Sequence, residues 1–188
     1  VFFYSGHGTR VTDASPLDES DGYDEALFTY SGNITDDELG DSLSWMSMGS
    51  TVLAIDACYS GGMLKAAGDA VKGVGEATGA PGDGFMRDIV GDAGVRDPDD
   101  GSNIVILTAS DDDELSYETS SLQNGYFTYY VVQGLDEPGN PANTDGSPWI
   151  CAEEAFAYAS PRVTADKPIQ HPQMYDGYTG ELDFRSVT

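Results

Sequence analysis

The apolar residues of this chain gather in three short runs, each of which ends at glycine or polar residues. The runs are Val1–Tyr4, Thr51–Ile55 and Asn103–Ala109. Short runs of β-branched and aromatic residues bounded by turn residues are typical of buried strands. Parallel strands present polar side chains just past their carboxyl ends. The residues that follow these runs are therefore the first candidates for chemistry.

Segments with a helical pattern lie between and after the strands. Thr35-Asp36-Asp37-Glu38 is a capping box that predicts a helix from Thr35 to about Met48. Over Gly125–Leu135 the apolar residues follow a helical spacing, although the aromatic content also permits a strand. We expect another helix over Pro148–Ala159 and a final pair of strands within His171–Phe184.

Two segments rich in turn residues predict loops. Thr12–Glu25 forms an acidic loop after the first strand, and residues 63–102 form a glycine-rich segment that we expect to be a flexible linker. Strands that alternate with helical segments predict an α/β fold with a mainly parallel central sheet flanked by helices. The length fits a single domain over residues 1–188.

A histidine and a cysteine follow the first two strands. The first strand leads into Ser5-Gly6-His7-Gly8, and the second leads into Asp56-Ala57-Cys58-Tyr59-Ser60-Gly61. A thiol is nucleophilic only as the thiolate, so it needs a base or a cation nearby. Two strand ends at one edge of a sheet would supply both groups, which predicts a catalytic dyad. The alternative is that His7 is a turn residue and Cys58 a buried core thiol.

These motifs resemble those of the caspase-like cysteine peptidases, and of the metacaspase branch most closely. The matching pieces are Ser5–Gly8, Asp21–Glu25, Thr35–Leu39 and Asp56–Gly61, with the histidine about 50 residues before the cysteine. The resemblance covers residues 1–135 well and the remainder loosely. Legumain, clostripain and gingipain relatives also place His-Gly and Cys at strand ends, but the second and third pieces favour metacaspases.

The resemblance implies a caspase-like three-layer sandwich and a cysteine endopeptidase that requires no cofactor for its chemistry. Domains of this kind normally have one or two strands before the histidine strand, so we expect a missing N-terminal segment or subunit as a partner. Cys58 would be the nucleophile, and His7 the base and later the acid. The backbone N–H groups of Gly8 and Cys58 are the expected donors to the oxyanion.

Asp56 lies two residues before Cys58 and leaves the strand on the same side. The resemblance makes Asp56 the floor of a pocket for a substrate Arg or Lys. The Ser110–Glu114 loop resembles the other wall, with Asp112 the expected partner and Ser110 a further contact. The substrate would then be a protein or peptide with a basic P1 residue. The alternative for the loop is a solvated acidic surface.

The acids Asp21, Asp24, Asp36 and Asp37 are candidates for a calcium site, because calcium-dependent metacaspases use aspartates from these regions. Calcium would then be an activator. Lys65 stands where such enzymes have an acid shortly after the cysteine, which argues against calcium. Asp36 and Asp37 are also favoured by the helix dipole alone.

Half of the basic residues fall in the glycine-rich segment after Cys58. We expect self-processing after one or more of them, with the arginines preferred. They are Lys65, Lys72, Arg87 and Arg96. Exposed loops of this kind are where proteases cut folded chains. The alternative is that these charges only solvate a loop.

The chain carries 33 acidic and 8 basic residues, for a net charge of −25. A folded, lysine-poor acidic surface suits high salt, which screens self-repulsion, so we expect a halophilic source. An ordinary acidic protein is the alternative. Nucleic acid and anionic membranes are unfavourable partners for this charge. The sequence lacks an apolar run long enough to span a membrane and a signal-peptide pattern, so a cytoplasmic location is expected, with an extracellular one open.

The second cysteine and the second histidine are expected to be structural. Cys151 follows a plausible helix start and is expected to be a buried thiol, and His171 precedes a proline in a loop. A rival interpretation of the whole chain is an acidic, calcium-dependent interaction module whose dyad is idle.

Overall fold

The structure is a computed structural model that describes residues 1–14, 22–45, 49–58, 69–71, 89, 103–111 and 114–187. Six of the residues singled out from the sequence lie outside the described residues. They are Asp21, Lys65, Lys72, Arg87, Arg96 and Asp112. Most of the expected linker at 63–102 also lies outside them. Within it the structure describes strand β6 (Asp69–Val71) and the buried Ile89.

The centre of the fold is a sheet of four strands in the order β1-β5-β7-β11. Its members are β1 (Phe2–Ser5), β5 (Thr51–Asp56), β7 (Ile104–Thr108) and β11 (Gln173–Asp176). The first three run parallel, and β11 pairs antiparallel with β7. The three predicted strands are thus confirmed, and so is the α/β class with a mainly parallel sheet. Strands β5 and β7 are buried throughout, whereas β1 alternates between half-buried and exposed residues because it lies at the edge of the sheet.

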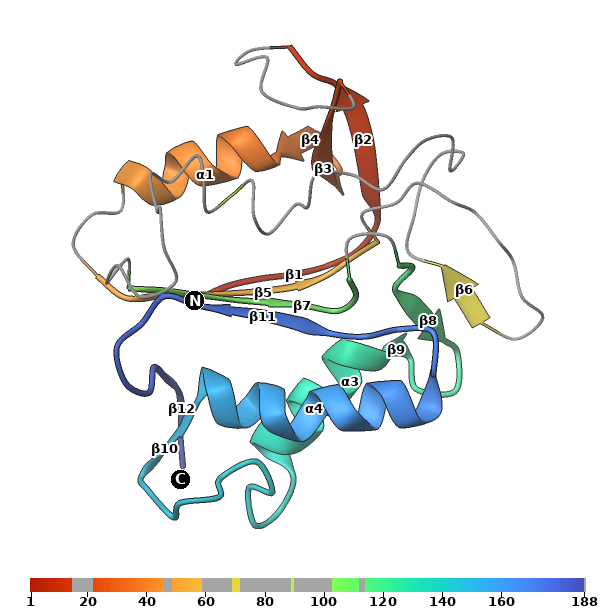
Figure 1. The fold of residues 1–188 in the computed structure, drawn as a ribbon. Coiled ribbons are helices and arrows are strands. Elements are labelled where there is room, and N and C mark those ends of the chain that lie inside the picture. Colours follow the sequence, from red (N-terminus) through yellow and green to blue (C-terminus); the bar gives the residue numbers. More distant parts are fainter. Residues whose placement is uncertain are drawn as a thin grey trace.

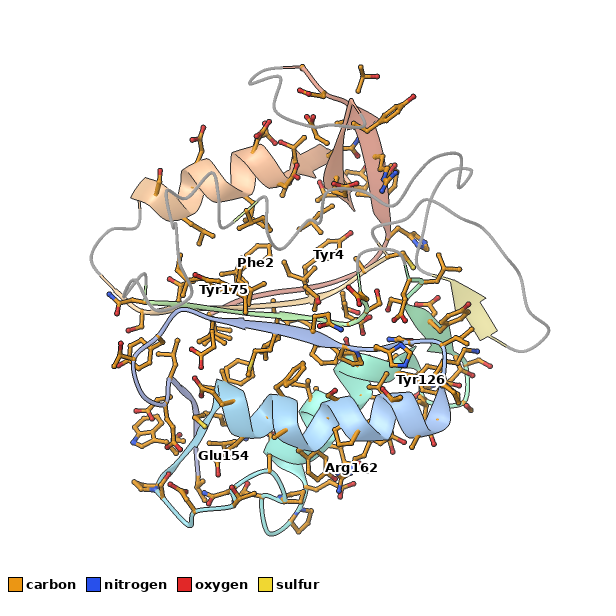
Figure 2. All side chains as sticks on the ribbon, viewed as in Figure 1. Phe2, Tyr4, Tyr126, Glu154, Arg162 and Tyr175 are labelled. Atoms are coloured by element: carbon orange, nitrogen blue, oxygen red, sulfur yellow. The ribbon has the colours of Figure 1, made fainter. Side chains whose placement is uncertain are left out.

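Both faces of the sheet are covered, which explains why its central strands are apolar throughout. Leu53 and Ile55 of β5 belong to a core on one face, together with residues of helix α1 (Asp36–Trp45). Val52 and Ala54 belong to a second core on the other face, with residues of helices α3 (Tyr126–Asp136) and α4 (Ala152–Asp166). Figure 1 shows α1 on one side of the sheet and α3 and α4 on the other. In Figure 2, Phe2, Tyr4 and Tyr175 lie on the side that faces α1.

A three-stranded sheet connects the end of β1 to α1. It consists of β2 (Gly8–Thr12), β3 (Tyr23–Thr29) and β4 (Gly32–Thr35), all antiparallel. The expected loop over Thr12–Glu25 is therefore shorter than predicted, because Tyr23–Glu25 pair with β2. The predicted capping box is confirmed: Thr35 Oγ1 accepts from the Glu38 amide at 3.2 Å, and Glu38 Oε2 accepts from the Thr35 amide at 3.3 Å.

In the C-terminal third of the chain, one predicted helix is confirmed and the predicted start of another is wrong. Tyr126–Asp136 is helical, which settles the ambiguity between helix and strand at this segment. The helix expected over Pro148–Ala159 instead begins at Ala152, because Trp149–Cys151 form strand β10, which pairs with β12 (Asp183–Ser186). The two strands expected within 171–184 exist as β11 and β12, but they lie in different sheets.

Cys151 is buried, as expected, and it has a structural role at the start of α4. Its Sγ accepts from the Glu154 amide at 3.3 Å, while Glu154 Oε2 accepts from the Cys151 amide at 3.2 Å. Burial, with the neighbouring acids, raises the pKa of the Cys151 thiol to about 12. A thiol in this state is inert as a nucleophile.

A further small sheet lies beside the carboxyl end of the central one (Figure 1). It consists of β6, β8 (Tyr117–Thr119) and β9 (Asn124–Gly125), all antiparallel. No helix within the described part of the chain is long and apolar enough to cross a membrane.

Candidate active site

The structure brings the His7 and Cys58 segments together at the carboxyl edge of the central sheet. Ser5 is paired with Asp56, and the Gly6 amide donates to the Asp56 carbonyl at 3.1 Å. A β-carbon placed on Gly8 would come within 1.6 Å of the Cys58 carbonyl oxygen. His7 therefore sits between two points at which its own segment contacts the Asp56–Cys58 segment.

The backbone on either side of His7 is fixed by neighbouring strands. The Phe28 amide donates to the His7 carbonyl at 2.9 Å, which extends the β2–β3 pairing by one residue. The Tyr4 hydroxyl lies 2.8 Å from the same carbonyl and 2.8 Å from that of Phe28. Burial raises the pKa of Tyr4, so this hydroxyl stays a hydrogen-bond donor. The His7 side chain itself is exposed.

The Cys58 thiol is buried, with only 1% of the residue exposed. Its Sγ accepts from the Ser116 amide at 2.9 Å and donates to the Ser116 carbonyl at 3.0 Å. Tyr117 is buried against Cys58, and the half-buried Leu115 and Tyr126 pack on the same cluster. The thiol thus lies under the segment that leads into β8.

Asp56 is fully buried, and its carboxylate is surrounded by donors. One oxygen accepts from the Ser116 hydroxyl at 2.7 Å. The other accepts from the Thr128 amide at 2.9 Å and the Thr128 hydroxyl at 2.5 Å. Thr128 lies in the first turn of α3, where backbone N–H groups lack partners within the helix and the helix dipole favours an anion. These donors explain how a carboxylate is tolerated at a buried strand end.

The second predicted wall of the pocket is described only in part. Ser110 is buried at the end of β7, where its carbonyl accepts from the Thr108 hydroxyl at 3.1 Å. Asp111 is half-buried, and Asp112 lies outside the described residues. The meeting of Asp56 with Asp112 stays a prediction, as do the oxyanion donors at Gly8 and Cys58.

The candidate calcium ligands do not form a metal site within the described residues. Asp24 and Asp36 are buried, and Asp37 is half-buried. Near them on β2 and β3, Arg10 Nε forms an ion pair with Glu25 at 2.7 Å. The described part of the chain contains no group of three or more His, Cys, Asp or Glu side chains that could hold a metal ion. Calcium binding by these acids therefore stays a prediction.

Sequence analysis did not identify Ser116 and Thr128, although both contact Asp56. The sequence indicates only that such residues must exist, because a carboxylate on a buried strand needs hydrogen-bond donors from other segments. Thr128 is the third residue of a largely apolar helix, and Ser116 follows an acidic stretch of the sequence. Neither position carries a pattern of its own.

Known proteins are similar to this chain in sequence and in fold. The family described as the caspase domain matches residues 1–182. Two curated relatives from Arabidopsis thaliana are similar to parts of the chain. Metacaspase-4 is 36% identical over 80 residues, which is 42% of this chain and 18% of that protein. Metacaspase-6 is 36% identical over 77 residues, which is 40% of this chain and 20% of that protein. The matched region is thus a fifth or less of either relative.

A solved structure shares the fold. Protein GSU0716 from Geobacter sulfurreducens matches 97% of this chain and 68% of its own, with a TM-score of 0.57 and 20% identity. The family match spans nearly the whole chain, and it includes the strand ends that carry His7 and Cys58. The chain belongs to the caspase-domain family.

Proposed function

We propose that this domain is a cysteine endopeptidase that cleaves protein or peptide substrates after Arg or Lys. The observation that carries the proposal is the position of Asp56. Its buried carboxylate ends the strand that leads to Cys58, and it is linked to Cys58 through a single residue, Ser116. A carboxylate next to a nucleophile selects a cationic side chain and repels an acidic one.

The reaction follows from the roles of two side chains. The Cys58 Sγ attacks the carbonyl carbon of the basic P1 residue, and the thiol proton passes to the His7 imidazole. His7 then donates that proton to the leaving amine, and a thioester remains on Cys58. Water, deprotonated by His7, attacks the thioester, which releases the acid product and restores the thiol. The negative oxygen formed at each addition requires fixed donors, for which the amides of Gly8 and Cys58 are our candidates.

The test is a series of fluorogenic peptides that differ only at P1. Arg and Lys are compared with Asp and with citrulline, which has nearly the shape of Arg but no charge. We expect hydrolysis of the Arg and Lys peptides, and little of the citrulline and Asp peptides. Efficient cleavage after Asp, or equal cleavage after Arg and citrulline, would refute the proposed specificity.

A further inference from the structure

We infer that Ser116 is a positioning residue that couples occupation of the pocket at Asp56 to release of the Cys58 thiol. The inference rests on the proposed function and adds a mechanism of control to the same site. In this mechanism the enzyme without substrate holds its nucleophile covered and protonated. When a cationic side chain reaches Asp56, the Cys58 thiol is uncovered.

Ser116 bonds to both groups through different atoms. Its backbone amide and carbonyl bond to the thiol at 2.9 and 3.0 Å, and its hydroxyl bonds to the Asp56 carboxylate at 2.7 Å. Ser116 and Asp56 are each 0% exposed, and Cys58 is 1% exposed. A substrate side chain therefore cannot touch Asp56, nor a carbonyl carbon approach the sulfur, until the residues that cover them move, and Ser116 contacts both.

The bond to the Ser116 carbonyl also holds the S–H proton. The carbonyl oxygen accepts this proton, while the Ser116 amide donates to the same sulfur. Attack on a peptide bond requires the proton to pass to a base instead. Withdrawal of the carbonyl removes this acceptor and opens the sulfur at the same time.

A substrate cation has the chemistry to displace the Ser116 hydroxyl. A guanidinium or ammonium adds the attraction of opposite charges to its hydrogen bond with a carboxylate, which a neutral hydroxyl does not, and a guanidinium can also bond through two N–H groups. Thr128 continues to hold the other Asp56 oxygen, so the carboxylate itself stays in place. The next residue, Tyr117, is anchored by its amide to the Gln170 side chain at 3.1 Å and by the pairing of β8. On the other side, Glu114 accepts from the His171 amide at 2.6 Å, so the displacement is confined to Leu115 and Ser116.

The experiment measures alkylation of Cys58 by iodoacetamide, followed by peptide mass spectrometry. Butylguanidinium stands in for an Arg side chain, and butylurea is its uncharged match. In the wild type we expect butylguanidinium to speed alkylation about threefold to tenfold, the equivalent of one hydrogen bond, and butylurea to have no effect. Cys151 is the internal control in every sample, because it is buried and bonds to Glu154 at the start of α4.

Two variants complete the test. Ser116→Ala removes the hydroxyl and keeps the backbone, so alkylation should be fast without butylguanidinium and should not accelerate further. Ser42→Ala removes a serine hydroxyl that bonds to the Glu38 carbonyl in α1, and it should behave as the wild type. A Ser116→Ala enzyme that responds like the wild type would overturn the inference.

The wild-type comparison decides the matter even if Ser116→Ala does not fold. Equal alkylation with butylguanidinium and butylurea would overturn the inference. If that same enzyme still hydrolysed the Arg peptides, the proposed function would stand and only the coupling through Ser116 would be wrong. If it hydrolysed none of them, both would fall.

Discussion

The Cα of Gly8 lies against the backbone of Cys58 so closely that a β-carbon would sit 1.6 Å from the Cys58 carbonyl oxygen. This contact joins the strand end that carries the histidine to the strand end that carries the cysteine. The atoms of Cys58 in this contact are backbone atoms, so they cannot move aside by a change of rotamer as a side chain could. The spacing of the two segments therefore depends on the absence of a side chain at position 8.

Replacement of Gly8 by alanine should separate the two segments. We expect Gly8→Ala to lose nearly all peptidase activity and about 1–3 kcal/mol of the free energy of unfolding, as overpacked cores do. Gly49→Ala is the matched control, because a β-carbon there meets no atom within 4 Å. Urea unfolding and hydrolysis of an Arg peptide measure the two effects. A Gly8→Ala enzyme as active as Gly49→Ala would contradict the close approach.

Loss of the proposed nucleophile should abolish catalysis without unfolding the domain. Cys58→Ala removes one sulfur atom from a buried site, so the circular dichroism spectrum should match that of the wild type while hydrolysis of Arg peptides disappears. Cys151→Ser keeps an acceptor at the start of α4 and should remain active. Retention of full activity in Cys58→Ala would rule out the assignment of the nucleophile.

Neutralising Asp56 should remove the preference for basic substrates. Asp56→Asn keeps the shape of the side chain but not its charge. We expect kcat/KM for Arg peptides to fall about 100-fold or more, because a buried cation left without its partner costs about 2–5 kcal/mol. The same change at the exposed helix residue, Asp41→Asn, should leave kcat/KM unchanged. An Asp56→Asn enzyme that still discriminates Arg from citrulline would place the specificity elsewhere.

Self-processing should occur within the glycine-rich segment that follows Cys58. An enzyme specific for Arg and Lys finds half of the chain's basic residues there, and we expect cuts after Arg87 or Arg96 before Lys65 or Lys72. Intact-mass and N-terminal analysis of the purified wild type is compared with Cys58→Ala. Identical masses and no new N-termini between residues 63 and 102 would reject self-processing.

Glu154 should make the stability of the domain depend on pH. Its burial acts to raise the pKa, but hydrogen bonds from Thr144, Cys151 and Asp145 outweigh burial and lower the pKa below its ordinary value of 4.5. The ionised form therefore stabilises the fold above the ordinary pKa, and this contribution disappears as the pH falls through the lowered pKa.

The comparison of Glu154→Gln with the wild type isolates this effect. At neutral pH we expect the variant to lose about 1–3 kcal/mol of unfolding free energy, since buried donors lose a charged acceptor. Urea unfolding from about pH 7 to about pH 3 should show the difference narrow in acid. A difference that stays constant over that range would show that the charge of Glu154 does not matter.

The sequence was most informative where one element is specified by several independent signals. The strand before Cys58 combines apolar residues with a following glycine-rich turn, and it was located to within one residue. The helix after Thr35 has a capping box and begins as expected. By contrast, Trp149–Cys151 were predicted to be helical, because the pairing of β10 with the distant β12 leaves no local pattern.

The same distinction holds at the site. His7 and Cys58 follow strand ends that the sequence makes visible, and the structure places their segments side by side. Ser116 and Thr128 reach Asp56 from segments 60 and 72 residues away along the chain. Contacts of that kind arise from the tertiary arrangement, so a single sequence does not reveal them.

Strand β5 contributes side chains to two hydrophobic cores, one on each face of the central sheet. Each core is called a compartment below. Leu53 and Ile55 face the compartment under α1, while Val52 and Ala54 face the one under α3 and α4. Loosening of either compartment is therefore transmitted to the same strand, and through it to the cysteine at its end. A smaller residue at Val52 would loosen the packing under α3 and α4, and one at Leu53 would loosen the packing under α1. Substitutions at two neighbouring positions would thus reach the same cysteine from opposite faces of the sheet.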